Sequence, residues 1–487
     1  TTNANNQYTL PGSGGYEYVD YKGTKMAKEL VDILNQAEID RDNACKKHGI
    51  ALELGDIKIS HPEFISYYYD QYSNQKQEIE YSIQKTGTNR TGYVPEKMPD
   101  EQQCLNKGYT WAEDFTRKAI SAITENYQGF NKAIEAGIEL TDSDVDFILA
   151  QCDLLETASR FQQKSIEELL EAIYGEDYTA SMFKAREIML VYKQKYQSYA
   201  KQKLADGYSE AELKEKLDED TNAYTLIVGR VYLIEGDFDA VEVSKISNEE
   251  EFIAYAQKNN PVENYDAEVV TRCNYVNRNA ISDTFGNEVA EWMFSSERVP
   301  GEIGFVQGSA FRYLVYIEKL PYFNTSKKIM AYDVEYDENI TQEDAQKTFE
   351  DTQAIYDEWK NSEATAESFE EMCYAVTDMP VRDVMAGDYY YVFNDWILDE
   401  SRKPGDTVLL DSDVGCSILY FVQDNPEDYD WKNNIRTDMS EADYKAAYEE
   451  DVEKNYEENR NTVVINKAYK TVNITIARKL AEEAKEE

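Results

Sequence analysis

The chain offers few side chains that could carry out acid–base or nucleophilic chemistry. It has two histidines, His48 and His61, and lacks the His-Glu-x-x-His, Gly-x-Ser-x-Gly, phosphate-loop and dinucleotide-binding glycine patterns. His61 falls in the first turn of an expected helix, where we predict a surface position. The 95 acidic residues guarantee many chance carboxylate pairs, so no pair stands out as a general acid and base. We predict no catalytic residue from these motifs.

Metal-binding patterns are equally weak. Thr141–Asp146 alternates carboxylates as a calcium loop does, but Phe147 stands where an EF-hand needs glycine. The segment therefore predicts an acidic, capped helix start. The six cysteines are widely spaced and form no Cys-x-x-Cys pair, which favours free, mostly buried thiols. We expect no metal and no cofactor.

The composition limits the partners. With 95 acidic and 50 basic residues the net charge is −45, a field that repels nucleic acid and anionic membrane surfaces. The 39 tyrosines suit surfaces that bind other proteins, although they could equally pack helices together. No apolar run is long enough to span a membrane.

One segment occurs twice. Shifting the sequence by 104 positions (396 minus 292) places Trp292 on Trp396, with no gap from Glu291–Ile317 to Asp395–Phe421. Arginine, Pro-Gly and tyrosine residues also coincide, as Pro300-Gly301 does with Pro404-Gly405. This spacing indicates an internal duplication into two tandem globular domains.

A helical domain is expected to precede the two duplicated domains in the sequence. Apolar residues recur at helical spacing from about Tyr21 to Asp220. Capping boxes mark several helix starts. They are Ser60-x-x-Glu63, Thr110-x-x-Glu113, Ser165-x-x-Glu168 and Ser209-x-x-Glu212.

Strands begin near Asn222, and each copy predicts a small α+β domain with helices on a mostly antiparallel sheet. In each copy we expect a first strand, then a Trp-containing helix, a Pro-Gly turn and a last strand. The segments expected to be strands are Tyr224–Ile234, Tyr313–Ile317, Lys328–Glu335, Asp388–Phe393 and Ser417–Val422; those expected to be helices are Asn248–Gln257, Gln342–Trp359 and Ser368–Tyr374.

After Trp431 the pattern is helical again. Ser440 is predicted to cap a helix with Tyr444, Tyr448, Val452 and Tyr456 on one face. This stripe needs a partner, for which the N-terminal helices are the obvious choice.

The predicted organisation is multidomain, α and α+β. It has a linker (1–20), the N-terminal part of a helical chaperone domain (21–221), two inserted domains (222–323 and 324–434) and a C-terminal helical segment that returns to the helical domain (435–487). The polar, glycine-rich start without an initiator methionine leads us to expect a signal or anchor segment before it.

This order of segments resembles the SurA/PrsA-type extracytoplasmic foldases, whose inserted domains are parvulin-like peptidyl-prolyl isomerases. The resemblance rests on the Trp-containing helix, the arginine and the Pro-Gly-acid turn that each copy contains. It also rests on Ser368–Val376, which looks like a parvulin helix, and on Ser60–Tyr72 and Thr110–Phe115 in the helical part. The resemblance implies a SurA-N-like helical domain, with the protein tethered to the outer face of a bacterial cytoplasmic membrane by a segment outside this sequence.

The sequence departs from that family where catalysis is concerned. Parvulins carry one histidine in the first strand and another in the last. Neither copy here has any histidine, and Tyr313 and Ser417 stand where the second would fall. Any isomerase activity is therefore in doubt.

The resemblance implies a chaperone or foldase that binds unfolded or extended polypeptide, with the parvulin-like domains mainly as non-catalytic binding modules. An active peptidyl-prolyl isomerase is the first alternative, and a cell-surface interaction protein on the same scaffold is the second. As peptide-binding candidates we predict Phe393, Trp396, Leu398, Trp292, Phe294 and Tyr313. A core role for these residues is the competing interpretation.

Overall fold

The computed structural model describes residues 15–234, 240–262, 265–309, 311–337, 340–377 and 379–459. Most of the predicted linker and everything after residue 459 lie outside the described residues. The protein divides into two units, each described by itself. Unit 1 comprises residues 1–206 and 440–487, and unit 2 comprises residues 207–439.

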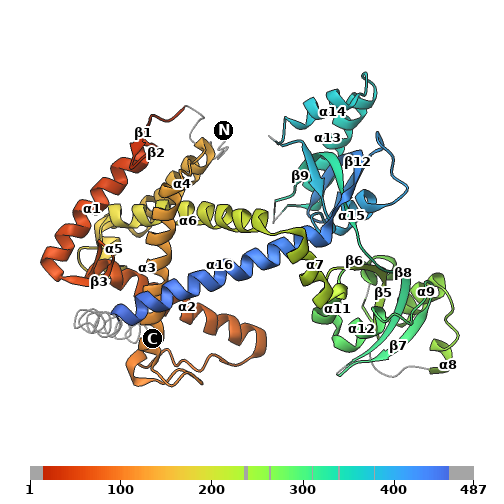
Figure 1. Cartoon of the computed structure of the whole chain (residues 1–487), viewed down its shortest axis with the longest axis horizontal. Coiled ribbons are helices and arrows are strands. Elements are labelled where there is room, and N and C mark those ends of the chain that lie inside the picture. The colour runs from red at the N-terminus through yellow and green to blue at the C-terminus, as the bar shows by residue number, and fades with distance from the viewer. Residues whose placement is uncertain are drawn as a thin grey trace, which may run out of the picture. The chain divides into compact units, whose positions relative to one another are not determined.

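Unit 1 is mainly helical, with two small β-hairpins (Figure 1). Its elements in sequence order are β1 (Tyr18–Tyr21), β2 (Thr24–Ala27), α1 (Lys28–His48), β3 (Ile50–Leu54), β4 (Ile57–Ser60), α2 (His61–Thr86), a 3-10 turn (Pro99–Glu101), α3 (Trp111–Glu135), α4 (Asp142–Gln162), α5 (Ile166–Tyr174) and α6 (Ala180–Gly207). α16 (Asp430–Asn459) begins in unit 2 and ends in unit 1.

The predicted helix starts are confirmed. Ser60 and Thr110 accept hydrogen bonds from the backbone N–H three residues later. Ser165 and Ser209 form complete reciprocal capping boxes, and so does Thr141 at the acidic start of α4. These caps satisfy backbone donors that the first turn of a helix otherwise leaves open.

Aromatic side chains from α2 and α3 form the centre of the unit 1 core. Phe115 of α3 meets Tyr68 of α2 edge-to-face, with ring centroids 5.8 Å apart. Phe130 at the other end of α3 meets Tyr192 of α6 at 5.4 Å. Many of the tyrosines therefore pack helices together, as the competing interpretation of their abundance held.

A buried charge accompanies this core. Glu63 is 5% exposed, and Tyr127 donates a hydrogen bond to its carboxylate. Arg41 donates in turn to the Tyr127 hydroxyl at 2.9 Å. Burial raises the pKa of Glu63, against the opposing charge of Arg41.

The prediction that His61 lies on the surface is wrong. His61 is 3% exposed, and its ring lies over Gly49, whose carbonyl accepts from the His61 backbone N–H at 3.3 Å. The β3–β4 hairpin turns directly into α2 at this point, so the first turn of α2 is enclosed.

Unit 2 contains two four-stranded antiparallel sheets with the same strand arrangement (Figure 1). The first repeat has β5 (Leu226–Ile234), α8 (Ala240–Val243), α9 (Glu249–Asn259), α10 (Ala267–Val270), β6 (Arg272–Val276), α11 (Arg278–Phe285), α12 (Asn287–Met293), β7 (Ile303–Gln307) and β8 (Arg312–Tyr322), preceded by α7 (Glu210–Glu219) and a 3-10 turn (Thr221–Ala223). The second has β9 (Thr325–Glu335), α13 (Gln342–Lys360), α14 (Ala366–Cys373), β10 (Val381–Val384), α15 (Tyr391–Leu398), β11 (Thr407–Ser412) and β12 (Gly415–Tyr429).

The sheet orders are β6-β5-β8-β7 and β10-β9-β12-β11, so the first and last strands of each repeat pair at the centre. Helices cover both faces of each sheet. In the first repeat α11 and α12 cover one face and α8 and α9 the other. In the second, α15 covers one face and α13 and α14 the other. The topology thus repeats as the duplicated segment predicts.

Three local predictions for this region are wrong. Asp388–Phe393 is not a strand: the edge strand is β10, and α15 begins at Tyr391 because Phe393 and Ile397, one helical turn apart, both face the core. The Pro-Gly turn leads into an additional strand, β7 or β11, before the last strand. Ser440 caps no new helix, because α16 runs through it without a break.

Close strand pairing predicts a large effect of one methyl group. A Cβ on Gly229 of β5 would lie 2.3 Å from the Tyr316 carbonyl oxygen of β8. We expect Gly229→Ala to lower the free energy of unfolding of unit 2 by about 1–3 kcal/mol, as overpacking does. Gly207→Ala is the matched control, because open space surrounds that position. Urea unfolding followed by circular dichroism measures both, and equal midpoints for the two variants would contradict the close approach.

Candidate functional site

The duplicated segment forms the same clamp in both repeats. The Arg298 guanidinium lies 4.8 Å from the Trp292 ring centroid, and Arg402 lies 5.1 Å from Trp396. The N–H of each turn glycine donates to the last strand, from Gly301 to the Ile317 carbonyl at 2.7 Å and from Gly405 to the Phe421 carbonyl at 2.9 Å.

Both turn glycines have positive φ, 83° and 94°, which favours glycine. An acidic side chain closes each turn, with Glu302 and Asp406 accepting from the backbone N–H three residues earlier. The repeated residues thus fix the turn against the central strand.

The six predicted peptide-binding residues lie in or beside the repeat cores. Phe393 and Leu398 are each 4% exposed, Phe294 is 5% and Tyr313 is 6% exposed. Trp292 and Trp396 are half-buried at the edges of these cores. The positions suit packing, and peptide binding by these residues stays a prediction.

Two facing positions on the central strands differ between the repeats. In the first repeat Tyr313 pairs across the sheet with Leu233. In the second, Ser417 pairs with Asp333. The same register therefore holds an apolar pair in one copy and a polar pair in the other.

Asp333 is the centre of a polar cluster in the second repeat. Its carboxylate accepts from the Ser417 hydroxyl at 2.6 Å and the Tyr389 hydroxyl at 3.1 Å, and it pairs with Arg382. Burial and this carboxylate raise the pKa of Tyr389 far above its usual value. Burial, with a smaller contribution from Asp333, raises the pKa of the nearby Cys373 thiol to about 12. Neither group is a base or nucleophile near neutral pH.

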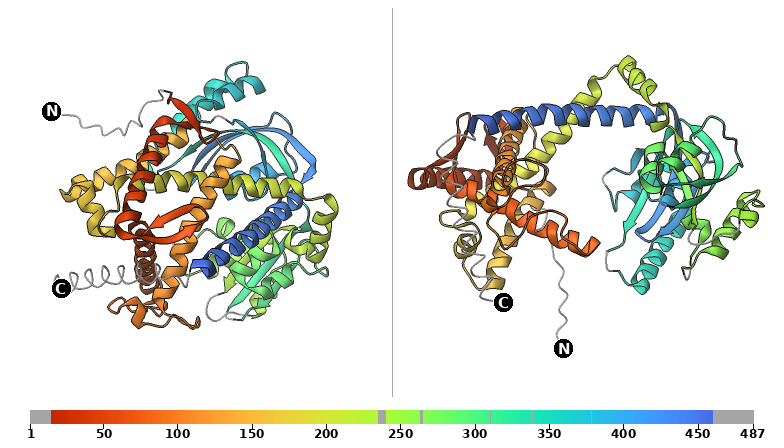
Figure 2. Two further views of the ribbon diagram at one scale, coloured as in Figure 1. Left: turned by 60° about the vertical axis from the view of Figure 1, so that its left-hand side comes forward. Right: turned by 90° about the horizontal axis from the view of Figure 1, so that it is seen from below.

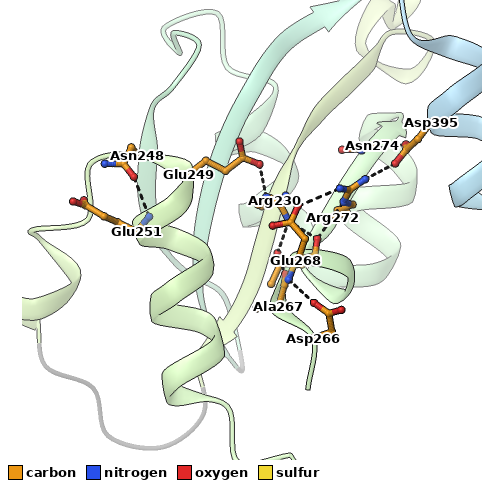
Figure 3. Close-up of polar contacts among 11 residues, drawn as sticks. Arg230, Asn248, Glu249, Glu251, Asp266, Ala267, Glu268, Arg272, Asn274 and Asp395 are labelled. Carbon is orange, nitrogen blue, oxygen red and sulfur yellow. Dashed lines mark hydrogen bonds and ion pairs between the residues drawn. The ribbon is translucent and has the colours of Figure 1, made fainter. Parts of the chain in front are cut away.

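Unit 2 also holds a charged cavity of about 490 Å³ beside β5 and β6 (Figure 3). Arg230 is 4% exposed and donates to Glu249 at 2.6 Å and to Glu268 at 2.9 Å. Arg272 pairs with Asp395 at 2.6 Å, which joins β6 of the first repeat to α15 of the second. The ion pairs drawn in Figure 3 match Arg230 and Arg272 with carboxylates of the protein itself, so the two arginines need no charged ligand.

A cavity suited to a polypeptide lies in unit 1, between α3, α6 and the unit 1 part of α16. It is an open groove of about 840 Å³. We name it the tyrosine groove after Tyr196 and Tyr199 of α6 and Tyr444 and Tyr448 of α16, which line it. Tyr444 and Tyr448 are stacked, with centroids 6.5 Å apart and planes 5° apart.

Polar contacts along α16 join it to the other two walls of the groove. Lys132 of α3 pairs with Asp451 at 3.3 Å, and Lys201 of α6 pairs with Glu441 at 2.5 Å. Ser121 of α3 meets the Tyr448 hydroxyl at 3.4 Å. Figure 2 shows α16, in blue, crossing other helices of unit 1.

The sequence predicts the apolar stripes of α6 and α16 and favours the N-terminal helices as the partner of α16, but it does not predict that the two stripes line one groove. The tyrosine spacing on each helix was visible, and so was the need of α16 for a partner. The groove could not be predicted because α6 and α16 are separated in the sequence by nearly all of unit 2.

Two classes of site have no geometric support in the described part of the protein. No cluster of three or more His, Cys, Asp or Glu residues there could hold a metal ion. No helix there is long and apolar enough to cross a membrane.

The protein thus combines a helical unit bearing an aromatic groove with a unit of two α+β repeats. No protein-family model matches it, and no curated protein matches it. A crystal structure of PrsA from Bacillus subtilis matches over 62% of this sequence and 98% of that one, at 13% identity and a TM-score of 0.18. That likeness does not establish parvulin domains here, and family membership stays a prediction.

The Asp333 cluster yields a stability prediction. We expect Asp333→Ala to lower the free energy of unfolding by about 1–3 kcal/mol, because the half-buried donors of Arg382 and Tyr389 lose their acceptor. Denaturant unfolding measures the change. Leu233→Ala at the equivalent position of the first repeat serves as the comparison, since no charged partner is lost there.

Ser417→Ala should add little once Asp333 is absent, because the two share one hydrogen bond. Full additivity of the two substitutions would contradict the cluster.

Proposed function

We propose that the protein is a chaperone or foldase that binds unfolded or extended polypeptide segments, and that the tyrosine groove is their main binding surface. The groove carries the proposal. It is open, it is lined by four tyrosines from two helices, and its volume of about 840 Å³ holds several side chains.

Tyrosine suits a surface that must accept many sequences. Its ring offers a large apolar contact at a low cost in conformational entropy, and its hydroxyl pairs with the backbone of an extended polypeptide. Tyr199 is 43% exposed, so its ring is available to a ligand. Tyr196 and Tyr444 are half-buried, so packing holds their rings in place in the groove wall.

Charges at the groove are balanced. Lys132 and Lys203 lie on its walls together with Glu135 and Asp443. A client segment therefore meets no net field of one sign locally, although the net charge of the whole protein is −45. Apolar contact decides affinity at such a surface, and sequence preference is weak.

The two repeats of unit 2 act, in this proposal, as non-catalytic binding modules. Each sheet has two edge strands, β6 and β7 in the first and β10 and β11 in the second. An extended peptide can add to such an edge through backbone hydrogen bonds. Phe305 on β7 is 41% exposed and offers an apolar contact beside one edge.

The proposed location is outside the cytoplasmic membrane, and the proposed partners are client polypeptides. Both follow from the sequence resemblance.

Removing groove rings tests the binding surface. We expect Tyr444→Ala/Tyr448→Ala to raise the Kd for an extended, apolar, fluorescein-labelled peptide about tenfold or more. The reason is that the loss of each ring removes an apolar contact area of ~100 Å² or more. Fluorescence anisotropy with the full-length protein measures Kd. Tyr374→Ala/Tyr391→Ala is the matched control, because those two tyrosines are 56% and 41% exposed in unit 2, outside the groove. Equal losses in both double variants would contradict the assignment.

Chaperone activity is tested by aggregation. We expect equimolar protein to slow the light-scattering increase of an unfolded reporter, and the Tyr444→Ala/Tyr448→Ala variant to do so less. No effect at several-fold excess would refute the proposed function. Binding of one folded partner with no preference for unfolded polypeptides would favour the interaction-protein alternative.

A further inference from the structure

A second cavity in unit 1 has a chemistry unlike the tyrosine groove. It encloses about 470 Å³ between the C-terminal half of α2, the loop of residues 87–110 and the first turns of α3. Four cationic side chains line it, Lys85, Arg90, Lys107 and Lys118, against two carboxylates, Glu78 and Asp114. We name it the basic pocket. Such a concentration of positive charge is unusual for a protein with a net charge of −45.

The cations are only partly neutralised. Lys107 and Lys118 share one carboxylate, Asp114, at 2.7 and 2.9 Å. Burial alone would raise the pKa of Asp114, but these two ammonium groups hold it below its usual range. Lys85 and Arg90 make no ion pair with any carboxylate in the described part of the protein.

Two buried donors in the pocket wall also lack acceptors. The Gln75 side-chain amide and the Trp111 indole N–H have no hydrogen-bond partner among the described residues, and their residues are 4% and 5% exposed. Both residues line the basic pocket. An indole N–H can only donate, so its missing partner must be an acceptor. Buried donors without partners are rare in folded proteins and point to a ligand or a bound solvent molecule.

The walls are fixed before any ligand arrives. Gln102 is 7% exposed, and its side chain accepts from the Val94 N–H at 2.7 Å and donates to the Val94 and Lys97 carbonyls at 2.9 Å each. Tyr93 is fully buried against Trp111, with centroids 5.2 Å apart. The Gln102 bonds brace the loop of residues 87–110 internally, and the Tyr93–Trp111 contact ties it to α3.

We propose that the basic pocket binds a carboxylate of an extended polypeptide, with Lys85 and Arg90 supplying the charge and Gln75 and Trp111 the buried hydrogen bonds. A carboxylate accepts several hydrogen bonds at once and so matches this donor set. Leu105 and Tyr81, 57% and 59% exposed, also line the pocket and contact apolar atoms beside the carboxylate.

The carboxylate belongs either to the C-terminus of the bound polypeptide or to one of its Asp or Glu side chains. The inference rests on the proposed function only in taking a polypeptide as the ligand, because the pocket and the tyrosine groove share no lining residue. The strong negative field of the whole protein disfavours a long polyanion such as nucleic acid.

The test uses four labelled leucine-rich peptides with the full-length protein. One has a free C-terminus, one is amidated, and two are amidated with an internal Glu or an internal Gln. We expect the free or the Glu peptide to bind at least tenfold tighter than its neutral counterpart, and the tighter of the two identifies the source of the carboxylate. Equal binding of all four peptides overturns the proposal. So does displacement by inorganic phosphate at the peptide's own concentration, which would indicate a general anion site.

Variants locate the binding. Lys85→Gln/Arg90→Gln should raise the Kd of the carboxylate peptide at least tenfold and reduce its salt dependence, with folding intact because both side chains are exposed. Lys46→Gln/Lys164→Gln removes the same charge from exposed positions outside the pocket and should change Kd less than twofold. An equal loss in both double variants, or no loss in the first, overturns the assignment.

Trp111→Phe removes the indole donor while keeping the aromatic contact with Tyr93. We expect several-fold weaker binding of the carboxylate peptide, unchanged binding of its neutral counterpart, and a lowered but still cooperative unfolding transition, because the smaller ring leaves a cavity beside Tyr93 and Phe115. Unchanged affinity would contradict the role of Trp111.

Tyr444→Ala/Tyr448→Ala should leave carboxylate discrimination intact. Failure of the tyrosine groove and failure of the basic pocket are therefore distinguishable.

Discussion

The packing of α16 against α3 is the contact on which the tyrosine groove depends. Tyr456 is 4% exposed within the unit 1 core, although it lies in the last stretch of the described residues. The Arg117 guanidinium stacks on its ring at 3.9 Å, and its hydroxyl donates to Glu113 at 3.1 Å. Without α16 the tyrosine groove would lose one wall, and Ser121 would lose its contact with Tyr448. The groove exists only once segments from both ends of the sequence have come together.

The duplicated segment shows what a repeated pattern preserves. Trp292 and Trp396, with their arginines and Pro-Gly turns, make equivalent contacts because each must bring the backbone back beside the central strand. The positions opposite each other on the central strands are free to differ, as Leu233 and Asp333 show. The repeat thus preserves the contacts that fold each domain, while the facing side chains on its central strands differ.

Sequence periodicity predicted helices and strands well where the local preference of the residues agreed with the packing in the folded protein. Capped, strongly amphipathic helices such as α3 and the central strands of both repeats lie close to their expected positions. The errors came where tertiary packing overrode local preference. The aromatic run before Trp396 suggests a strand, but Phe393 and Ile397 reach the core only as a helix. His61 looked exposed because the sequence does not reveal that a hairpin encloses the first turn of α2. The tyrosine groove could not be predicted, since it joins segments distant in sequence, and the basic pocket, although it forms within residues 75–118, depends on burial that only the fold decides.

The burial of the thiols has a consequence for redox chemistry. Five of the six cysteines are buried, Cys45 is partly exposed, and all six are free. Burial raises the pKa of every one of them, that of Cys152 to about 11 and that of Cys273 to about 12. The thiolate, not the thiol, reacts with disulfides and peroxides. The folded protein is therefore slow to exchange or oxidise its cysteines, and only unfolding exposes a set of reactive sulfurs. An oxidising medium would therefore act on the five buried thiols chiefly in unfolded copies of the protein.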